Sequence, residues 1–229
     1  MLTPYDWQEG IGHRAEYVES RLSTGIPVVA ISLDAGVLAV TYCRQSRKIF
    51  EVYDRLMFAA MGQQSDIESI RVAAIDFTHQ QGFQRSEDDV TIQRVVTAVS
   101  EPVKRAFADF SSPPVIAVSM FMQVGASPAD DRYHAINYDG DFDKKRESCY
   151  LAGSSEAGKY LRESRGSESW SGVSVDDAIS KCEKLIEEAM EAAGTETGDA
   201  LSDLKLEAGL MARGDEGHRV FQLLRGDWD

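Results

Sequence analysis

The sequence predicts an α+β fold, a four-layer αββα sandwich in which helices cover the outer sides of two antiparallel sheets. Three observations lead to this prediction. Runs of strand-like segments alternate with pairs of helix-like segments, in the order ββββ-αα-βββ-αα-ββ. The strands come in hairpins around short turns. The first strands are too apolar to have one face in water, so each is expected to be covered on both sides.

The chain begins with a segment that predicts an amphipathic helix. Thr3 followed by Pro4 is typical of a capped helix start with proline in the first turn. Gly10 and Gly12 each weaken the first half by about 1 kcal/mol relative to alanine, so the ordered part is expected to begin near His13. The apolar residues recur at helical spacing, at Trp7, Ile11, Ala15, Val18 and Leu22.

Two predicted hairpins follow this leader, and two helices follow the hairpins. Capping signals start the first helix at Ser65, and Pro102 is expected to kink the second. The strands are predicted at Val28–Leu33, Val37–Tyr42, Lys48–Val52 and Leu56–Met61, and the second helix at Asp89–Phe107.

The second half of the chain repeats the alternation. Ser174, with Asp177 three residues later, predicts the capped start of a long helix. The strands are predicted at Val115–Val124, Tyr133–Asn137, Ser148–Ala152, Lys205–Ala212 and His218–Leu224, and the helices at Ser155–Arg162 and Val175–Ala193. We expect residues 1–229 to form one domain, with residues 1–24 as an N-terminal gate and helix segment.

Composition excludes several classes of function. With 38 acidic and 24 basic residues, the formal charge is −14, which argues against binding to nucleic acid or to an anionic membrane. No apolar run approaches the roughly 20 residues of a spanning helix, so a cytoplasmic protein is expected. The three cysteines and four histidines are scattered, which predicts neither disulfides nor a metal site. Two segments that imitate a phosphate-binding loop and a calcium loop each lack required residues, so no cofactor is expected.

The hairpin region resembles a known family. Residues 48–62 read KIFEVYDRLMFAAMG, and the stretch from Ile26 to Gly62 resembles the 20S proteasome superfamily, most closely the α-type subunits of bacterial, actinobacterial-type proteasomes. The resemblance covers nearly the whole chain and implies the fold of the N-terminal-nucleophile hydrolases. Further short matches follow in order at Asp89-Val90-Thr91, Tyr138-Asp139-Gly140, Gly153 and Leu206-Glu207-Ala208.

The resemblance implies a non-catalytic α-type subunit. Catalytic β subunits of the family expose a threonine at the head of the first strand, whose own amine serves as the base. Here Ile26 occupies that position and has no nucleophilic atom, while the expected acidic partner falls on Tyr42. Thr24 lies two residues earlier and follows Ser23 instead of the glycine of a cleavage site. No catalytic residue is therefore assigned.

Lys48 matches the catalytic lysine of β subunits and the lysine of the activator pocket in α subunits. The resemblance implies that Lys48 pairs with the C-terminal carboxylate of a ring ATPase tail in a pocket between protomers. Gly25 matches the glycine that lets the tail approach the backbone, and Gln63 replaces an apolar residue of the pocket. The alternative is that Lys48 is a solvated charge beside Arg47.

The leader also has an expected role. In α subunits the residues before the ordered helix converge at the ring axis and restrict access, so residues 1–8 are the candidate gate. Pro4, Tyr5, Asp6 and Trp7 are expected to hold its closed arrangement, and an ordinary frayed terminus is the alternative.

Three hypotheses follow. The first is an α-type subunit that forms a homo-oligomeric, heptameric ring, caps rings of β-type subunits, docks ring ATPase tails and controls the passage of unfolded protein substrates. The second is an N-terminal-nucleophile, threonine-type hydrolase that matures at Thr24 and uses Lys48 to activate it. The third is a proteasome-like scaffold without β-type partners.

Overall fold

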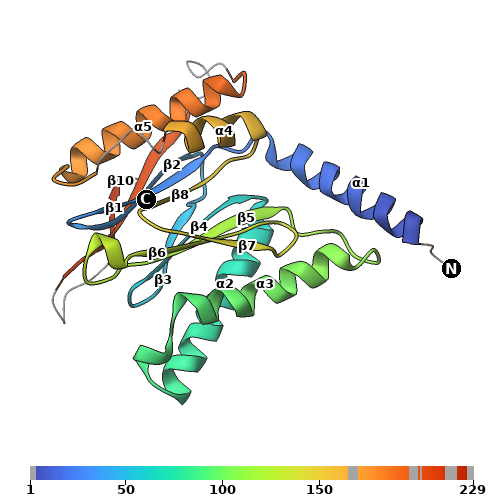
Figure 1. Ribbon diagram of the computed structural model, residues 1–229, viewed down its shortest axis with the longest axis horizontal. Helices are drawn as coiled ribbons and strands as arrows, with labels where there is room; N and C mark the ends of the chain where they lie inside the picture. Colours follow the sequence, from blue (N-terminus) through green and yellow to red (C-terminus); the bar gives the residue numbers. More distant parts are fainter. Residues whose placement is uncertain (1–3, 165–169, 196–200, 202, 215–220, 226–229) are drawn as a thin grey trace.

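The computed structural model describes residues 4–164, 170–195, 201, 203–214 and 221–225. In this part of the chain, two antiparallel sheets of five strands each pack face to face, and helices cover both outer faces (Figure 1). The predicted αββα sandwich is confirmed. The helices are α1 (Pro4–Leu22), α2 (Gln64–Gln84), α3 (Ile92–Ala108), α4 (Ser155–Ser164) and α5 (Val175–Ala192).

The first sheet has the strand order β10-β9-β2-β1-β8. Every residue of β1 and β2 is buried. The reason is that one face of these strands meets the second sheet, while the other packs against α4 and α5. The strands are β1 (Val28–Leu33), β2 (Gly36–Cys43), β8 (Ser148–Leu151), β9 (Lys205–Ala212) and β10 (Phe221–Arg225), and the first residues of the last predicted strand lie outside the described part.

The second sheet has the order β3-β4-β5-β6-β7 and contains a strand that the sequence pattern missed. The predicted order βββ for this part of the chain is therefore wrong, because a fourth strand, β7, pairs with β6. Its residues are Phe-Asp-Lys-Lys, and as an edge strand it needs no apolar pattern. The strands are β3 (Ile49–Tyr53), β4 (Leu56–Gly62), β5 (Ala117–Gln123), β6 (Arg132–Ile136) and β7 (Phe142–Lys145).

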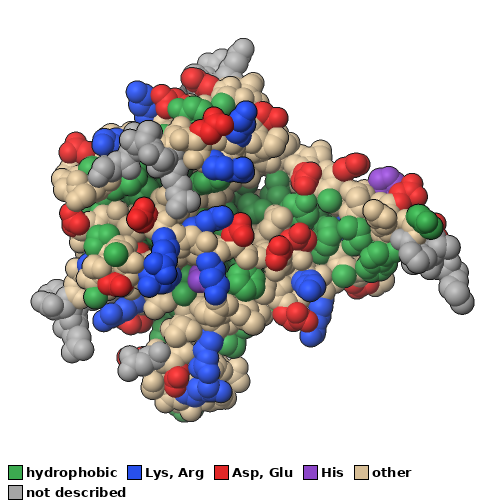
Figure 2. Space-filling view, viewed as in Figure 1, with side chains coloured by type: hydrophobic (Ala, Val, Ile, Leu, Met, Phe, Trp, Pro, Cys, Tyr) green, Lys and Arg blue, Asp and Glu red, His purple; other side chains and the backbone are tan. Residues whose placement is uncertain are grey.

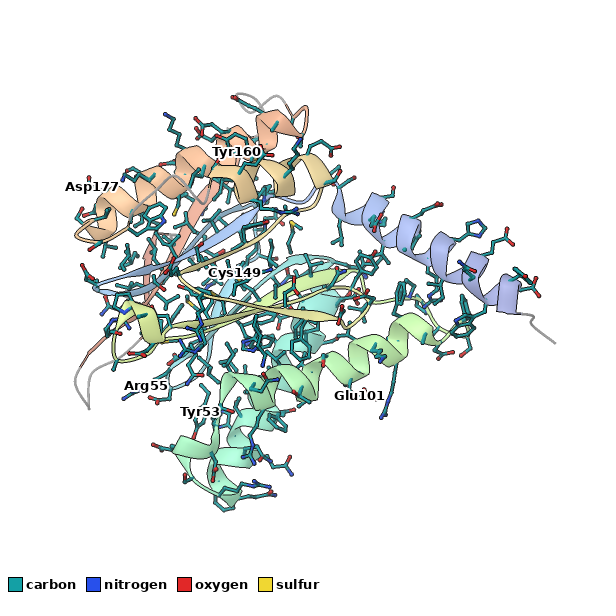
Figure 3. The ribbon with its side chains drawn as sticks, viewed as in Figure 1. Tyr53, Arg55, Glu101, Cys149, Tyr160 and Asp177 are labelled. Atoms are coloured by element: carbon teal, nitrogen blue, oxygen red, sulfur yellow. The ribbon has the colours of Figure 1, made fainter. Side chains whose placement is uncertain are left out.

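Helices α2 and α3 cover the outer face of the second sheet, where the rings of Phe58 and Phe121 lie 5.1 Å apart. On the other side, α5 begins at the predicted cap, since Ser174 Oγ accepts a hydrogen bond from the backbone N–H of Asp177 at 3.2 Å. Figure 3 labels Asp177 at this end of α5. Tyr160 of α4 donates its hydroxyl to Glu188 of α5 at 2.6 Å, which ties these two helices together. None of the described helices is long and apolar enough to cross a membrane.

Polar contacts connect the two sheets inside an otherwise apolar interface. The hydroxyls of Ser32 in β1 and Tyr133 in β6 lie 2.7 Å apart. Arg213, directly after β9, forms a bidentate ion pair with the buried Asp131 before β6, with N–O distances of 2.8 and 2.9 Å. The same guanidinium donates to Leu33 O at 2.9 Å. Arg213 therefore fastens the ends of strands from both sheets, although its sequence context, Arg-Gly-Asp, reads as a simple turn.

The leader helix starts earlier than expected. The prediction that its ordered part begins near His13 is wrong, because α1 is continuous from Pro4 to Leu22. The ring of Phe110, in the loop after α3, compensates for the glycines: it contacts Trp7 edge-on with ring centroids 4.9 Å apart. Arg14 lies over the same ring at 5.3 Å and donates to the backbone carbonyls of Ala106, near the end of α3, and Ser112, in the loop that follows.

Helix α1 projects from one end of the sandwich (Figure 1), and hydrophobic side chains gather between it and the body of the molecule (Figure 2). Val18 and Leu22 are buried in the core between the sheets, and Ile11 and Ala15 pack against that core. The C-terminal half of α1 is thus part of the fold, while its N-terminal half is held mainly through Phe110.

The two glycines of α1 provide a matched test of this packing. We expect Gly12→Ala to raise the free energy of unfolding by up to about 1 kcal/mol, because alanine favours the helix and its Cβ would meet no atom within 4 Å. A Cβ at Gly10 would lie 2.9 Å from Phe110 Cε1, so Gly10→Ala must displace the ring and should not stabilise the protein. Urea unfolding of the full chain measures both changes, and an equal gain from both would contradict the role of Phe110.

Candidate functional site

The candidate site lies where α1 joins the sandwich. The chain leaves α1 at Leu22, and the backbone N–H of Gly25 donates to Leu22 O at 2.7 Å. A Cβ added to Gly25 would lie 2.6 Å from Met61 Sδ, and one added to Gly153 would collide with Leu22 O. The connection between α1 and β1 therefore passes between β4 and the start of α4 with no room for side chains at these two glycines.

Ile26 stands directly before the first strand, separated from it by Pro27. Its side chain is partly buried and packs against the apolar layer between the first sheet and helices α4 and α5. The side chain therefore offers packing and no chemistry at the position where a nucleophile would stand. Thr24 is exposed, two residues earlier along the same connection.

Lys48 reaches this connection from the start of β3. Its Nζ donates to the backbone carbonyl of Ile26 at 3.3 Å, and the side chain is partly buried, not fully solvated. Burial removes water from the ammonium and lowers the pKa of Lys48 to about 8, although Cys43 and Glu207 act in the opposite direction. Lys48 thus places next to the backbone of Ile26 an ammonium group that loses its proton more readily than an ordinary lysine does.

Glu207 is a site residue that sequence reasoning did not single out. It lies on β9 with no solvent exposure, and its carboxylate crosses to the second sheet. Its Oε2 accepts the backbone N–H of Lys48 at 2.8 Å, and its Oε1 accepts that of Ile49 at 3.1 Å. Burial raises the pKa of Glu207, while these two bonds and Arg47 oppose the rise. The sequence signal was a single carboxylate inside the apolar run 206–211.

Two neighbouring residues of β2 point in opposite directions. Cys43 faces the site, and burial raises the pKa of its thiol to about 12, so it is a neutral group and a poor nucleophile at neutral pH. Tyr42 faces α5, where its hydroxyl donates to Glu183 at 2.8 Å and to Glu187 at 3.0 Å. The position at which an acidic partner would serve a nucleophile therefore holds a tyrosine that ties β2 to α5.

Gln63 lies at the same end of the molecule as Lys48 and Gly25. It is the exposed N-cap residue of α2, and its Nε2 donates to Ser65 Oγ at 2.9 Å. Met61, which contacts Gly25, precedes it by two residues. The structure therefore brings Lys48 into contact with the residue after Gly25 and places Gln63 on the rim of the same region.

The predicted gate residues lie on α1. Tyr5 is 83% exposed and Trp7 44% exposed, and Trp7 contacts Phe110. Pro4 and Asp6 belong to the first turn of the helix, while residues 1–3 of the predicted gate lie outside the described part. The described gate residues thus extend a helix that projects from the body (Figure 1).

Two further features of the described residues bear on ligands. No three His, Cys, Asp or Glu side chains among them come together as a metal site. A cavity of about 280 Å³ opens beside β6, β7 and β8, with Val118, Ala135 and Leu151 in its lining together with the carboxylates of Asp141 and Asp143. None of the predicted site residues lines this cavity.

Comparison with known proteins gives a consistent result. The chain is 30% identical to proteasome subunit alpha of Thermobifida fusca over 145 residues, which cover 62% of this chain and 58% of that protein. It is 28% identical to proteasome subunit alpha of Actinosynnema mirum over 216 residues, covering 93% of this chain and 80% of that protein. The same subunit of Salinispora arenicola is 28% identical over 217 residues, with 93% and 76% covered.

The three alignments cover different shares of the relatives' lengths. The chain spans 58% of the length of the Thermobifida relative and larger shares of the other two. No protein-family model matches the chain. The matches to several actinobacterial proteins, two of them over nearly the whole chain, confirm the resemblance expected from the sequence. The chain is a relative of the α-type subunits of bacterial proteasomes.

Proposed function

We propose that this chain is a non-catalytic α-type subunit that forms the outer ring of a 20S-type proteasome core, controls access to that core and docks ring ATPases. The observation that carries the proposal is the arrangement at the head of β1. Ile26 stands where a nucleophile would be needed, and the ammonium of Lys48 lies on its backbone carbonyl at 3.3 Å. With no hydroxyl or thiol at position 26 for it to activate, Lys48 can bind an anion but has no partner for peptide hydrolysis.

The docking role rests on the chemistry of the Lys48 ammonium and of the groups beside it. An ammonium with one long hydrogen bond retains donors for a carboxylate, and the C-terminal carboxylate of a peptide can supply the acceptor oxygens. Gly25 itself adds no side chain beside this backbone, although the side chain of Met61 packs against it. Gln63 on the rim presents an amide in place of an apolar surface, so the preferred tail is expected to carry a polar side chain near its end.

The gating role rests on the position of α1. A helix that projects from the body and exposes Tyr5 and Trp7 is suited to contact neighbouring copies around a ring axis. In this proposal residues 1–8 narrow the opening, the partners are further copies of this chain and β-type subunits, and unfolded proteins pass through in transit. We also propose that residues 1–229 form a single domain and that the protein acts in the cytoplasm.

Removing residues 1–8 tests the gate. We expect the truncated chain, assembled with β-type subunits, to hydrolyse short fluorogenic peptides several times faster than the full-length particle, since diffusion to the interior becomes less restricted. Urea unfolding of the truncated chain provides the control, because a loss of α1 packing would lower stability. Equal hydrolysis rates in both particles would remove the gate from the proposal.

Purification through a tag on this chain tests the assembly itself. We expect the tagged chain, isolated from its own cells, to co-purify with a β-type subunit. Electron microscopy should then show stacked rings. A ring of this chain alone, isolated under the same conditions, would favour a scaffold without β-type partners and contradict the proposed role in a protease core.

A further inference from the structure

Lys48 is a partly buried lysine without a carboxylate to neutralise it. Within the described residues, its Nζ makes one hydrogen bond, to the carbonyl of Ile26, and no salt bridge. Buried ammonium groups in proteins are normally paired, because removal from water penalises the charge. By comparison, the ammoniums of Lys145 and Lys184 lie 3.1 and 3.7 Å from carboxylates.

The carboxylate of Glu207, whose charge acts on Lys48, already accepts other hydrogen bonds. Both oxygens of Glu207 accept backbone N–H groups, those of Lys48 and Ile49, and the guanidinium of Arg47 lies 3.6 Å from Oε1. Turning the carboxylate toward the Lys48 ammonium would leave two buried N–H groups without acceptors, which costs more than the new pair would return. Glu207 is therefore fixed in place as an acceptor for the backbone of β3.

Cys43 is a further ionisable neighbour of Lys48, and it forms no ion pair with the ammonium. Cys43 on β2 is a neutral thiol, because burial raises its pKa to about 12, and it donates to the carbonyl of Lys205 at 3.5 Å. Burial is the cause that lowers the pKa of Lys48 to about 8, while electrostatic interactions with Cys43 and Glu207 raise it. The neutral amine is therefore more populated at Lys48 than at an exposed lysine.

We propose that Lys48 is a modification site: a nucleophilic amine that is acylated by small acyl phosphates. The neutral nitrogen attacks the acyl carbon, a C–N bond forms, the C–O bond to phosphate breaks, and phosphate leaves with the electron pair. The surplus proton of the amine passes to solvent, so the reaction needs no oxidant or reductant. A desolvated lysine is activated for this kind of attack in the same way as catalytic lysines.

The modification has a consequence that rests on the proposed function. An amide at Lys48 carries no positive charge, so the acylated chain should no longer bind a terminal carboxylate. Acyl phosphate levels would then regulate ATPase docking through this residue. The reactivity itself does not depend on that role and is measured without any tail peptide.

The test is site-resolved labelling of the folded, full-length chain with acetyl phosphate. At pH 7 a pKa near 8 leaves roughly a tenth of the amine neutral, against well below a thousandth for an ordinary lysine. Part of that advantage is lost, because nucleophilicity falls with pKa. We expect Lys48 to react about tenfold faster than the exposed Lys104 and Lys159, with a rate that levels off above about pH 8.

Peptide mass spectrometry at several time points and pH values gives the rate at each lysine. A Lys48→Arg variant, which keeps the charge, should lose the fast phase and retain the slow labelling of the other lysines. Labelling of Lys48 no faster than that of Lys104 and Lys159, or a Lys48 rate that climbs with theirs up to pH 10, would overturn the proposal. If Lys48 is labelled quickly but the labelled chain still binds tail peptides, the reactivity stands and the docking role fails.

Discussion

Replacing Arg213 with alanine is expected to lower the free energy of unfolding by about 3–5 kcal/mol, the largest stability effect among the substitutions considered. The substitution leaves Asp131, which has no solvent exposure, without its bidentate partner. It also removes donors from the carbonyls of Leu33 and Gly125, at the ends of strands from both sheets. Urea unfolding followed by circular dichroism measures the change.

An exposed ion pair offers the matched control. Arg105 and Glu101 lie one turn apart on α3, with side chains 78% and 55% exposed. Such pairs contribute about 0.3–0.5 kcal/mol, so Arg105→Ala should have little effect. If Arg213→Ala proves as mild as Arg105→Ala, Arg213 does not hold the two sheets together in the way the contacts indicate.

Lys48→Ala is expected to abolish the response of the assembled particle to an ATPase tail peptide, with at least a tenfold loss of affinity, while ring assembly is unchanged. The reason is that the substitution removes the ammonium but not the Glu207 bonds, which go to the backbone of residues 48 and 49. Since burial lowers the pKa of Lys48 to about 8, the wild-type affinity should also fall as the pH rises through 8.

Fluorescence anisotropy with a labelled tail peptide measures both effects. Lys159→Ala on the exposed surface of α4 is the control and should bind normally. A peptide with an amidated C-terminus should bind as weakly to the wild-type chain as the free-acid peptide binds to Lys48→Ala. Unchanged binding by Lys48→Ala would show that the carboxylate is held elsewhere.

Much of the sandwich could be predicted because its central strands are buried on both faces. The apolar runs of β1, β2 and β4 leave little choice of structure, and their predicted bounds agree with the observed ones to within a residue or two. Strand β7 was missed because it lies at a sheet edge, where pairing with β6 decides the conformation and charged residues are tolerated. The early start of α1 was missed because it depends on Phe110, about a hundred residues away.

Part of the candidate site could likewise be predicted from the sequence, and part of it could not. The sequence shows an isoleucine at position 26 and a lysine at position 48, and the site roles given to them through the family resemblance stay predictions. The roles of Glu207 and Arg213 could not be predicted, because each depends on contacts between strands of different sheets, which no local pattern encodes. A lone charge within an apolar strand was the available signal for Glu207, and it indicates a buried carboxylate without saying what it binds.

The intact mass of this chain, within the particle that it forms in its own cells, distinguishes an α-type subunit from an N-terminal-nucleophile enzyme. We expect the mass of the full chain with α1 still attached, in a complex whose peptide hydrolysis belongs to a separate β-type subunit. A chain that begins at Thr24, found together with peptide hydrolysis that is lost on substitution of Thr24, would contradict the non-catalytic role and identify this chain as the enzyme.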